Sequence, residues 1–337
     1  MNRAMLFEAL RRVRRAALGM NRRNLEFMVP YNPPALFALV DDKTGTKRSL
    51  AAAGIPVPAT YAELSRQWDL RRLDAILAGR TTFVVKPTRG AGGGGVLVVA
   101  GRAGDGFVKA SGAAVSLADL AAHCSDILAG AYASSTHSDE VLIEYCVQAD
   151  PVLGAISYRG VPDVRVLVFR GVPVQAMIRL PTRASDGRAN LHMGGMAVGI
   201  DLGTGVTTHG VLQGRATTVH PDLQAAVGGR QIPQWETMLS IAARCYDAVP
   251  LGYLGVDLVL DAELGPLVLE LNARHRLALT GTPIENRALD LWSIMQFVNP
   301  GYLGRRAAFA ARYDRPDAPS HSRRLLAARL RPVMVRR

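Results

Sequence analysis

Lysine is scarce in this sequence. The chain of 337 residues has four lysines against 36 arginines. The lysines stand at positions 43, 47, 86 and 109. Because arginine supplies most of the positive charge, a lysine inside a motif is a candidate for a specific role rather than a generic surface cation.

Cysteine and long apolar runs are also scarce. Cys124, Cys146 and Cys245 form neither a CxxC motif nor a Cys/His ligand set, which argues against a disulfide framework and a zinc site. We expect no membrane span, because no stretch of about 18 uninterrupted apolar residues occurs. The arginine-rich first 20 residues lack a continuous apolar segment, so we predict no signal peptide and a cytoplasmic protein.

Positive charge is plentiful at the two ends of the chain. The net charge is +12, with seven arginines in residues 1–23 and ten in residues 301–337. Basic ends attract nucleic acid, anionic lipid or acidic protein segments, although a solvated arginine-rich surface is the simpler interpretation. Apolar residues at 6, 10, 13 and 17 predict an amphipathic helix over residues 4–18, docked on the body or lying on a membrane.

A glycine-rich loop follows the third lysine. An apolar strand ends at Lys86, and five of the six residues at 90–95 are glycine, before a second apolar run at 96–99. Glycine lets backbone N–H groups approach an anion, and the lysine adds a point charge for phosphate. The loop opens no helix, so it is neither a P-loop nor a dinucleotide fingerprint. It predicts a strand–loop–strand hairpin over 82–99, either a flap over phosphates or a plain flexible hairpin.

Hydrophobic patterning predicts the remaining elements. The predicted helices cover 43–53, 61–77, 116–128, 233–247 and 284–297. The predicted strands cover 141–147, 164–169, 172–180, 255–260 and 267–271, with a polar loop at 181–198.

A group of oxygen-bearing side chains lies on the last two predicted strands. Asp257 sits in the first of them, and Glu270 and Asn272 in the second. Glu270 and Asn272 are two residues apart and therefore face the same side of a strand. Such a set suits Mg²⁺, which commonly bridges carboxylates to nucleotide phosphates. The alternative is one polar face of an antiparallel hairpin.

These motifs, taken in order, resemble the ATP-grasp superfamily of carboxylate–amine ligases, and within it the ribosomal-protein glutamate ligase type and its alpha-L-glutamate ligase-like relatives. The motifs are Asp42-Lys43, Gly54 to Pro58, Lys86 with its glycine loop, residues 141–145, Asp163 to Arg165, Arg188 to Gly195, Val256-Asp257 and Glu270 to Asn272. The resemblance spans about Val40 to Phe297. It implies an α+β, ATP-grasp fold in which two α+β subdomains clasp ATP.

The resemblance also implies site residues. Nucleotide-binding positions would be Lys43, Lys86, Gly92, Gly93, Gly94, Glu144, Tyr145, Cys146, Val147 and Asp163. Arg188, Asn190 and Arg165 would act on the phosphates and the reacting acyl group. Asp257, Glu270 and Asn272 would hold magnesium, as two ions that Mn²⁺ can replace.

The expected organisation has three parts. Residues 1–40 form a basic helix and a reduced segment where relatives have a larger N-terminal domain. Residues 41–300 form the ATP-grasp domain, with a nucleotide hinge near 141–148, and residues 301–337 form a loosely ordered basic tail. The chain reads Ala273-Arg274-His275-Arg276 where relatives have a Pro-Gly turn, so Arg274 or Arg276 either holds a substrate carboxylate or is a surface residue.

The predicted activity is ATP- and Mg²⁺-dependent ligation. A carboxylate is activated as an acyl phosphate and joined to an amine, with an amino acid such as glutamate added to a peptide, protein or small acceptor. Expected partners are amino-acid and carboxylate substrates and an acidic peptide or protein acceptor, with homo-oligomerisation left open. Nucleic acid is not an expected partner. One alternative is a different small-molecule substrate. The other is a basic nucleic-acid-binding protein on a decayed scaffold, against which the complete set of lysines and carboxylates argues.

Overall fold

The computed structural model describes residues 23–90, 93–132, 139–273, 292 and 305–314. The chain divides into two compact units, one of residues Asn32–Ala273 and one of Met1–Tyr31 with Arg274–Arg337. The described part of the latter unit includes the π-helix η1 (Asn24–Met28) and helix α10 (Arg306–Tyr313). The helix predicted at 4–18 lies outside the described residues, as does the one predicted at 284–297 apart from residue 292, which is helical. None of the helices in the described ranges combines the length and apolarity needed to cross a lipid bilayer.

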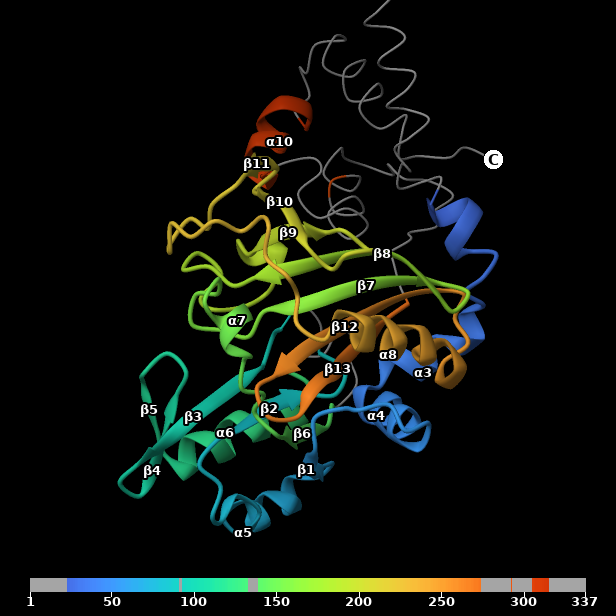
Figure 1. Ribbon diagram of the computed structural model, residues 1–337. Helices are drawn as coiled ribbons and strands as arrows, with labels where there is room; N and C mark the ends of the chain where they lie inside the picture. The colour runs from blue at the N-terminus through green and yellow to red at the C-terminus, as the bar shows by residue number, and fades with distance from the viewer. Residues whose placement is uncertain (1–22, 91–92, 133–138, 274–291, 293–304, 315–337) are drawn as a thin grey trace, which may run out of the picture. The chain divides into compact units, whose positions relative to one another are not determined.

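A six-stranded antiparallel sheet forms the first half of the unit 32–273 (Figure 1), in the order β1-β6-β2-β3-β4-β5. Its strands are β1 (Thr60–Leu64), β2 (Phe83–Pro87), β3 (Leu97–Ala103), β4 (Gly106–Lys109), β5 (Ala114–Val115) and β6 (Val141–Glu144). The 3-10 helix η3 (Gln67–Arg72), α5 (Leu73–Leu77) and α6 (Leu117–Leu128) accompany it. Phe83 and Phe107 meet edge-to-face in its core, with ring centroids 5.2 Å apart.

Local signals explain two of these elements. Helix α6 begins where predicted, because the Ser116 side chain accepts from the Asp119 N–H and the Asp119 carboxylate accepts from the Ser116 N–H. The predicted hairpin over 82–99 is confirmed, since β2 and β3 pair antiparallel with Phe83 opposite Val99. The glycine loop therefore connects two adjacent strands of this sheet.

The helix predicted over 61–77 is wrong in its first half. Residues Thr60–Leu64 form β1, an edge strand paired with β6, because tertiary pairing overrides the helix-like apolar spacing. The Asp69 carboxylate accepts from the N–H groups of Ser65 and Arg66 and so starts η3 only after the strand. Helix is present only as η3 and α5. The strand predicted over 141–147 likewise ends at Glu144.

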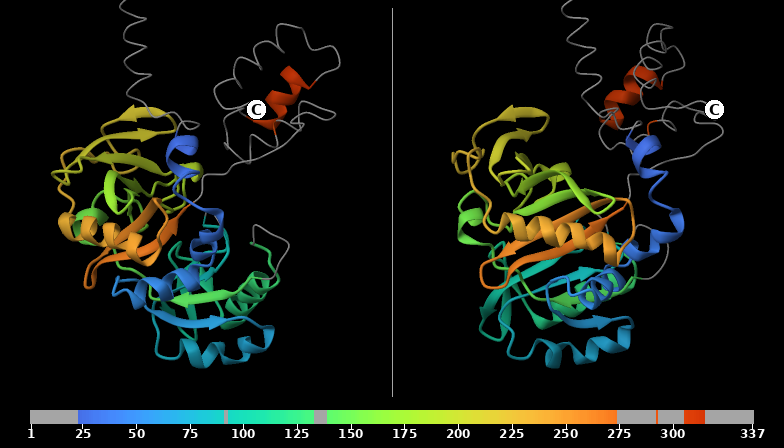
Figure 2. Two further views of the ribbon diagram at one scale, coloured as in Figure 1. Left: turned by 90° about the vertical axis from the view of Figure 1, so that its right-hand side faces the viewer. Right: turned by 45° about the vertical axis from the view of Figure 1, so that its right-hand side comes forward.

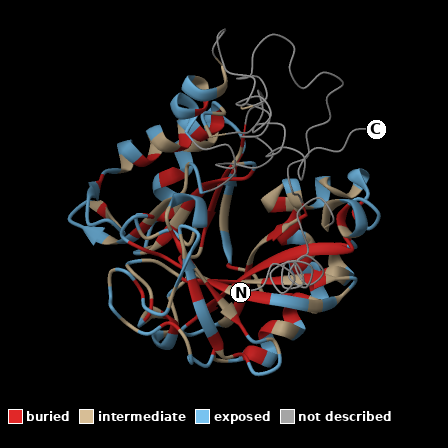
Figure 3. Cartoon of the chain, turned by 90° about the horizontal axis from the view of Figure 1, so that it is seen from above, coloured by how far each residue is buried: buried red, intermediate tan, exposed pale blue. Residues whose placement is uncertain are grey.

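A seven-stranded antiparallel sheet forms the second half, in the order β11-β10-β9-β8-β7-β12-β13. Its strands are β7 (Asp163–Phe169), β8 (Val172–Leu180), β9 (Met196–Ile200), β10 (Thr207–Leu212), β11 (Arg215–Thr217), β12 (Tyr253–Asp261) and β13 (Gly265–Asn272). Helix α8 (Trp235–Ala248) lies along it (Figure 2) and packs on β7, β8, β12 and β13. All nine residues of β12 are buried, and buried residues follow the strands in Figure 3.

The second half of the unit also contains several short helices. They are η2 (Pro34–Leu36), α3 (Ala38–Asp41), α4 (Lys43–Ala52), α7 (Pro151–Gly154) and η4 (Leu191–Met193). Helix α4 was predicted from its sequence, and it begins where the Asp42 carboxylate accepts from the Thr44 N–H. It packs against α8 and β13, which places its first turn beside the strand that carries Glu270.

Candidate functional site

Two lysines bind one buried glutamate at the end of β6. Glu144 is 3% exposed, and its Oε2 lies 2.5 Å from Nζ of Lys47 on α4. Its Oε1 pairs with Nζ of Lys86 on β2. Burial opposes ionisation of Glu144, but the ammonium groups of Lys86 and Lys47 outweigh it and hold the pKa of this carboxyl below its usual range. The Glu144 carboxylate is therefore ionised and lies between the two lysines.

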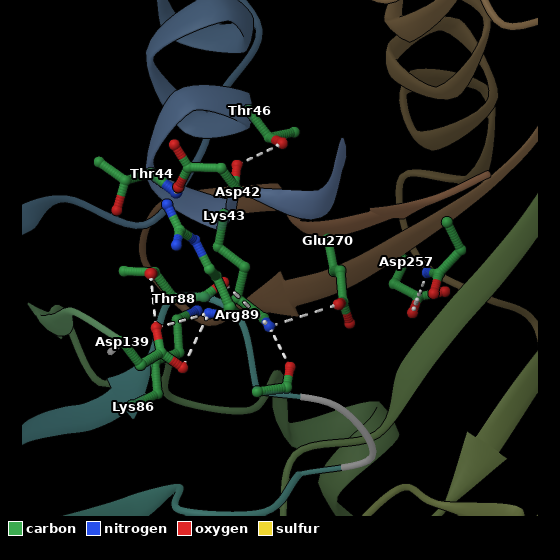
Figure 4. A network of polar contacts seen from close by, with 12 residues as sticks. Asp42, Lys43, Thr44, Thr46, Lys86, Thr88, Arg89, Asp139, Asp257 and Glu270 are labelled. Atoms are coloured by element: carbon green, nitrogen blue, oxygen red, sulfur yellow. Dashed lines mark hydrogen bonds and ion pairs between the residues drawn. The ribbon is translucent and has the colours of Figure 1, made fainter. Parts of the chain in front are cut away.

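A third lysine lies one helical turn before Lys47. Lys43 and Lys47 are four residues apart on α4 and share one helix face. The Nζ of Lys43 donates to the Gly90 carbonyl at 2.5 Å and lies 3.8 Å from Oε1 of Glu270 (Figure 4). Burial lowers the pKa of Lys43 and outweighs the opposing effect of Glu270. Three of the four lysines of the chain thus surround the start of the glycine loop.

The glycine loop is fastened at its first stem by a buried aspartate. The Asp139 carboxylate is 2% exposed and accepts from the Thr88 hydroxyl at 2.8 Å and from the Arg89 N–H at 2.9 Å. Figure 4 shows Asp139 facing Thr88 and Arg89 where β2 ends. Residue Gly90 packs so closely on Pro87 that a Cβ would lie 2.3 Å from its ring.

The second stem of the loop is held by α6 and the residues that follow it. The carbonyl of Gly95 lies 2.9 Å from Nε2 of His123, and a Cβ on Gly95 would lie 2.7 Å from the Tyr132 ring. Both Gly93 and Gly95 have positive φ, a conformation that other residues rarely adopt. Among the predicted loop glycines, Gly94 is exposed. Gly92 lies outside the described residues. The described stems hold the loop close to the three lysines.

The predicted magnesium ligands lie together on the β12–β13 hairpin. Asp257 stands directly opposite Glu270 in the ladder, and Nδ2 of Asn272 donates to Oδ2 of Asp257 at 3.0 Å. Glu270 is accessible, with 42% of its side chain exposed, whereas Asp257 has 4% exposed. Within the described residues, no three His, Cys, Asp or Glu side chains lie close enough together to hold a metal ion. A metal site built from Asp257 and Glu270 therefore needs the amide oxygen of Asn272 as its third ligand.

Asp257 is held by two arginines and by Asn272. Its Oδ1 accepts from Nε of Arg165 at 2.6 Å, and its Oδ2 accepts from Nη2 of Arg165 at 2.6 Å and Nη2 of Arg179 at 2.8 Å. With Asn272 it receives four donors, three at Oδ2 and one at Oδ1, so an acceptor site remains on Oδ1. A cation fits here only if the Asn272 amide turns its oxygen, rather than its nitrogen, toward Asp257. The donor set is thus compatible with Mg²⁺.

Arg179 joins the two predicted aspartates. It pairs with Oδ1 of Asp163, donates to Oδ2 of Asp163 at 2.7 Å, and reaches Asp257 as well. Burial and the neighbouring Asp257 carboxylate raise the pKa of Asp163 to about 7. Although burial opposes ionisation of Asp257, Arg165 and Arg179 hold its pKa below the usual range. Two arginines and two aspartates thus form one compact network on β7, β8 and β12.

The loop that carries Arg188 and Asn190 is closed on itself. The Thr182 hydroxyl donates to the Gly194 carbonyl at 2.8 Å, joining the start of the loop to its end. The Asn190 side chain accepts from the His192 N–H and caps η4. Arg188 is exposed, and a Cβ on Gly93 would lie 4.0 Å from its Cδ. Arg188 therefore borders the glycine loop.

The predicted site residues occupy neighbouring positions, with clear exceptions. Glu144 faces the lysines, whereas Tyr145 and Val147 are half-buried and Cys146 is buried in the segment that follows. Gly92, Arg274 and Arg276 lie outside the described residues. A cavity of only about 10 Å³, lined by Lys43, Lys47 and Glu270 among others, lies beneath the cluster. A nucleotide would have to take the place of existing contacts there.

Three polar residues of the site were not predicted from the sequence. Lys47 could have been found from its spacing to Lys43, because i and i+4 share a helix face. Asp139 and Arg179 had no such signal. Their importance depends on contacts across 50 and 78 positions of sequence, to Arg89 and Asp257 respectively.

Comparisons with known families match two parts of the chain. The family model described as sugar-transfer associated ATP-grasp matches residues 22–289. A second model, described as SNF2-related domain, matches residues 261–337. The two matches share residues 261–289 and together cover everything after residue 21.

Curated proteins match a short stretch. The chain is 45% identical over 62 residues to TATA-binding protein-associated factor MOT1 of Saccharomyces cerevisiae, covering 18% of this chain and 3% of that protein. It is 47% identical over 66 residues to TATA-binding protein-associated factor 172 of Homo sapiens, covering 18% and 4%. The chain thus spans only a few per cent of the length of these relatives.

Solved structures resemble a larger part of the chain at low identity. D-cycloserine synthetase DcsG is 18% identical with a TM-score of 0.42, over 79% of this chain and 72% of that one. D-alanine–D-alanine ligase from Bacillus anthracis complexed with ATP is 16% identical with a TM-score of 0.39, over 71% and 55%.

Proposed function

This chain belongs to the sugar-transfer associated ATP-grasp family, and on that premise we propose that it is an ATP- and Mg²⁺-dependent ligase. It activates a carboxylate as an acyl phosphate, releases ADP and phosphate, and joins the acyl group to an amine. The superfamily and its fold are those predicted from the motifs. The glutamate ligase type, the amino-acid substrate and the roles of individual residues are parts of this proposal.

The observation that carries the proposal is the convergence of Lys43, Lys47 and Lys86 on Glu144, Glu270 and the glycine loop. The three ammonium groups pair with two carboxylates, whereas the nearby Asp139 carboxylate accepts from the Thr88 hydroxyl and the Arg89 N–H instead. A polyphosphate would supply further anionic oxygens and form charge-assisted hydrogen bonds with the lysines. Burial of several lysines in one place is unfavourable unless anionic groups compensate their charge.

The remaining site residues would contact different parts of the nucleotide. Residues 144–147 would bind the adenine base, and the glycine loop would cover the phosphates. Asp257, Glu270 and Asn272 would hold Mg²⁺, which neutralises charge on the transferring phosphoryl oxygens. Arg165 and Asp163 would border the phosphates, with Arg179 fixing both aspartates of the network.

The acyl group would lie beside Arg188 and Asn190. The guanidinium of Arg188 is exposed next to the glycine loop and can stabilise charge that develops on the reacting oxygens. Closure of the glycine loop would exclude water, which otherwise hydrolyses an acyl phosphate. The Thr182–Gly194 hydrogen bond keeps the loop of Arg188 compact before substrate arrives.

The family description favours one particular acceptor. Because the matching family is associated with sugar transfer, we propose a sugar-linked carboxylate or amine beside the amino-acid substrate first predicted. A screen of ADP release with amino acids, aminosugars and uronic acids tests both. Release that needs both a carboxylate and an amine supports ligation. ADP release that needs neither a carboxylate nor an amine contradicts ligation. The absence of ADP release from Mg·ATP with every substrate pair also contradicts it.

A second candidate function concerns the basic ends. Residues 32–273 contain 20 basic and 22 acidic side chains, whereas residues 1–31 and 274–337 contain 20 basic and six acidic ones. The whole excess of positive charge therefore lies outside the unit that holds the candidate site. Residues 261–337 match an SNF2-related domain. Short stretches of the chain also match TATA-binding protein-associated factor MOT1 and a putative ATP-dependent helicase/translocase of Bacillus subtilis. These likenesses support a polyanion such as nucleic acid as a ligand of the basic ends.

Removal of residues 315–337 tests this second function. The segment holds seven arginines and one aspartate. If it binds duplex DNA, the affinity of the full chain should fall linearly on a log–log plot against salt. The truncated chain should show a shallower slope, by about 0.9 for each DNA phosphate that the segment neutralises. Equal slopes for the two chains would leave the segment without a part in polyanion binding.

A further inference from the structure

The hinge segment after β6 is tied to both sheets by two consecutive side chains. Glu144 pairs with Lys86 on β2 of the six-stranded sheet and with Lys47 on α4. The Tyr145 hydroxyl donates to Oδ2 of Asp261 at 3.1 Å. Asp261 is the last residue of β12 in the seven-stranded sheet. The hinge is therefore held from two directions.

Asp261 is a buried carboxylate with every acceptor site used. It is 1% exposed. Its Oδ2 also accepts from the Gln148 N–H at 2.8 Å, and its Oδ1 accepts from the N–H groups of Glu263 and Leu264 at 3.0 and 2.9 Å. One half of this carboxylate thus fixes the hinge, and the other half fixes the β12–β13 turn.

Backbone hydrogen bonds reinforce the same junction. Ala149 and Asp261 form an antiparallel bridge. The Asp150 N–H donates to the Leu260 carbonyl at 3.0 Å, and the Ala262 N–H donates to the Gln148 carbonyl at 2.9 Å. The hinge therefore continues into a short ladder with the hairpin that carries Asp257, Glu270 and Asn272.

We propose that Asp261 is a positioning residue that sets the distance between the adenine hinge and the metal-binding hairpin. The inference rests on the proposed function. The base of a nucleotide would meet the segment after Glu144, and its phosphates would meet Asp257 and Glu270. Because Asp261 joins these two parts through Tyr145 and Gln148, it aligns the base site with the phosphate site before ATP binds.

Tyr145 reports on this role without disturbing the turn. Burial and the Asp261 carboxylate raise the pKa of Tyr145 to about 12, so its hydroxyl stays a proton donor throughout the working pH range. Tyr145→Phe removes this one hydrogen bond and leaves the contacts of Glu263 and Leu264 intact. Asp261→Asn removes the charge and weakens the junction further.

The test measures binding of Mg·ADP, Mg·GDP and Mg·pyrophosphate by calorimetry. We expect Tyr145→Phe to weaken Mg·ADP binding three- to tenfold, the range for one hydrogen bond, and Asp261→Asn to weaken it more. The preference for ADP over GDP should narrow. Pyrophosphate binding should not change, whereas a general loss of structure would weaken it as well. Amide exchange of residues 145–150 in the nucleotide-free variants should be faster.

The matched control is Asp201→Asn. Asp201 also caps a turn, accepting from the N–H and hydroxyl of Thr204, but these side-chain hydrogen bonds stay within that turn. It should behave as the wild type. Unchanged ADP affinity and unchanged exchange in Tyr145→Phe and Asp261→Asn would overturn the inference and leave the proposed function standing. Absence of Mg·ADP binding to the wild type would overturn both.

Discussion

Lys47 and Lys86 hold the two oxygens of the same buried carboxylate, Glu144, although one lies on α4 and the other on β2. The three groups depend on one another. Removal of either lysine leaves Glu144 one partner, whereas removal of the Glu144 charge leaves two buried cations facing each other.

Glu144→Gln should therefore destabilise the protein by about 3–5 kcal/mol at neutral pH, the usual cost of an unpaired buried charge. The folded-state pKa of Glu144 lies below its value of 4.5 in the unfolded chain. Its stabilisation is thus complete above that value and is lost as the pH falls through the folded-state pKa. Denaturant unfolding across pH should show the gap between wild type and variant narrowing in acid.

Glu63→Gln is the control for that series. Glu63 pairs with Arg48 at the surface, where an ion pair contributes at most about 1 kcal/mol. A Glu63→Gln effect as large as that of Glu144→Gln, or a gap that widens in acid, would contradict the assignment of the buried cluster.

Lys86→Ala and Lys47→Ala should each weaken ATP binding by about 1.5–3 kcal/mol, the range for a hydrogen bond to a charged group. Lys109, the remaining lysine, lies at the end of β4 and supplies the control Lys109→Ala. Calorimetric titration with a non-hydrolysable ATP analogue measures all three. Nucleotide affinity that is equal in Lys86→Ala, Lys47→Ala and Lys109→Ala would make the cluster purely structural.

Glu270→Gln should abolish Mg²⁺-dependent turnover while the fold survives. Glu270 is accessible and stands opposite Asp257, so its loss would remove a charged metal ligand and lower the rate on the order of a thousandfold. ADP release at saturating Mg²⁺ measures the effect. Glu263→Gln, in the turn of the same hairpin, should retain normal turnover. Near-normal ADP release by Glu270→Gln would exclude it as a ligand.

Gly160→Ala should displace the loop that carries Arg188. A Cβ on Gly160 would lie 1.9 Å from the Gly187 carbonyl oxygen, so the two segments must separate. We expect a loss of about 1–3 kcal/mol, typical of overpacking. Gly154→Ala, six residues earlier, meets nothing within 4 Å and should be tolerated. Equal melting temperatures for the two variants would show that the contact is not tight.

Sequence patterning predicted most of the fold because the signals were local. Residue 116 marked the start of α6, and the hydrophobic patterning of residues 164–169 and 172–180 marked the two strands of the β7–β8 hairpin. The helix predicted at 61–77 was wrong because pairing of β1 with β6 depends on residues about 80 positions away. The α+β, ATP-grasp fold itself was predicted from the order of the motifs and is confirmed by the family match.

The candidate site was predictable where the chemistry lies in the motifs themselves. Asp257 and Glu270 were placed on adjacent strands, and they pair in the ladder. The sequence carried no sign that Arg165 and Arg179 would both pair with Asp257, because these contacts arise only when β7 and β8 pair beside β12. Whether these residues bind nucleotide and metal stays a prediction.

The three buried cysteine thiols can report how fast different parts of the protein unfold locally. Cys124 lies in the core of the six-stranded sheet, Cys245 in that of the seven-stranded sheet and Cys146 in the hinge between them. Burial raises the pKa of the three thiols to about 12, 12 and 11, so an alkylating reagent can attack only after local unfolding. Mass-spectrometric labelling therefore reads three opening rates from one unmodified chain, and nucleotide should slow labelling of Cys146 most.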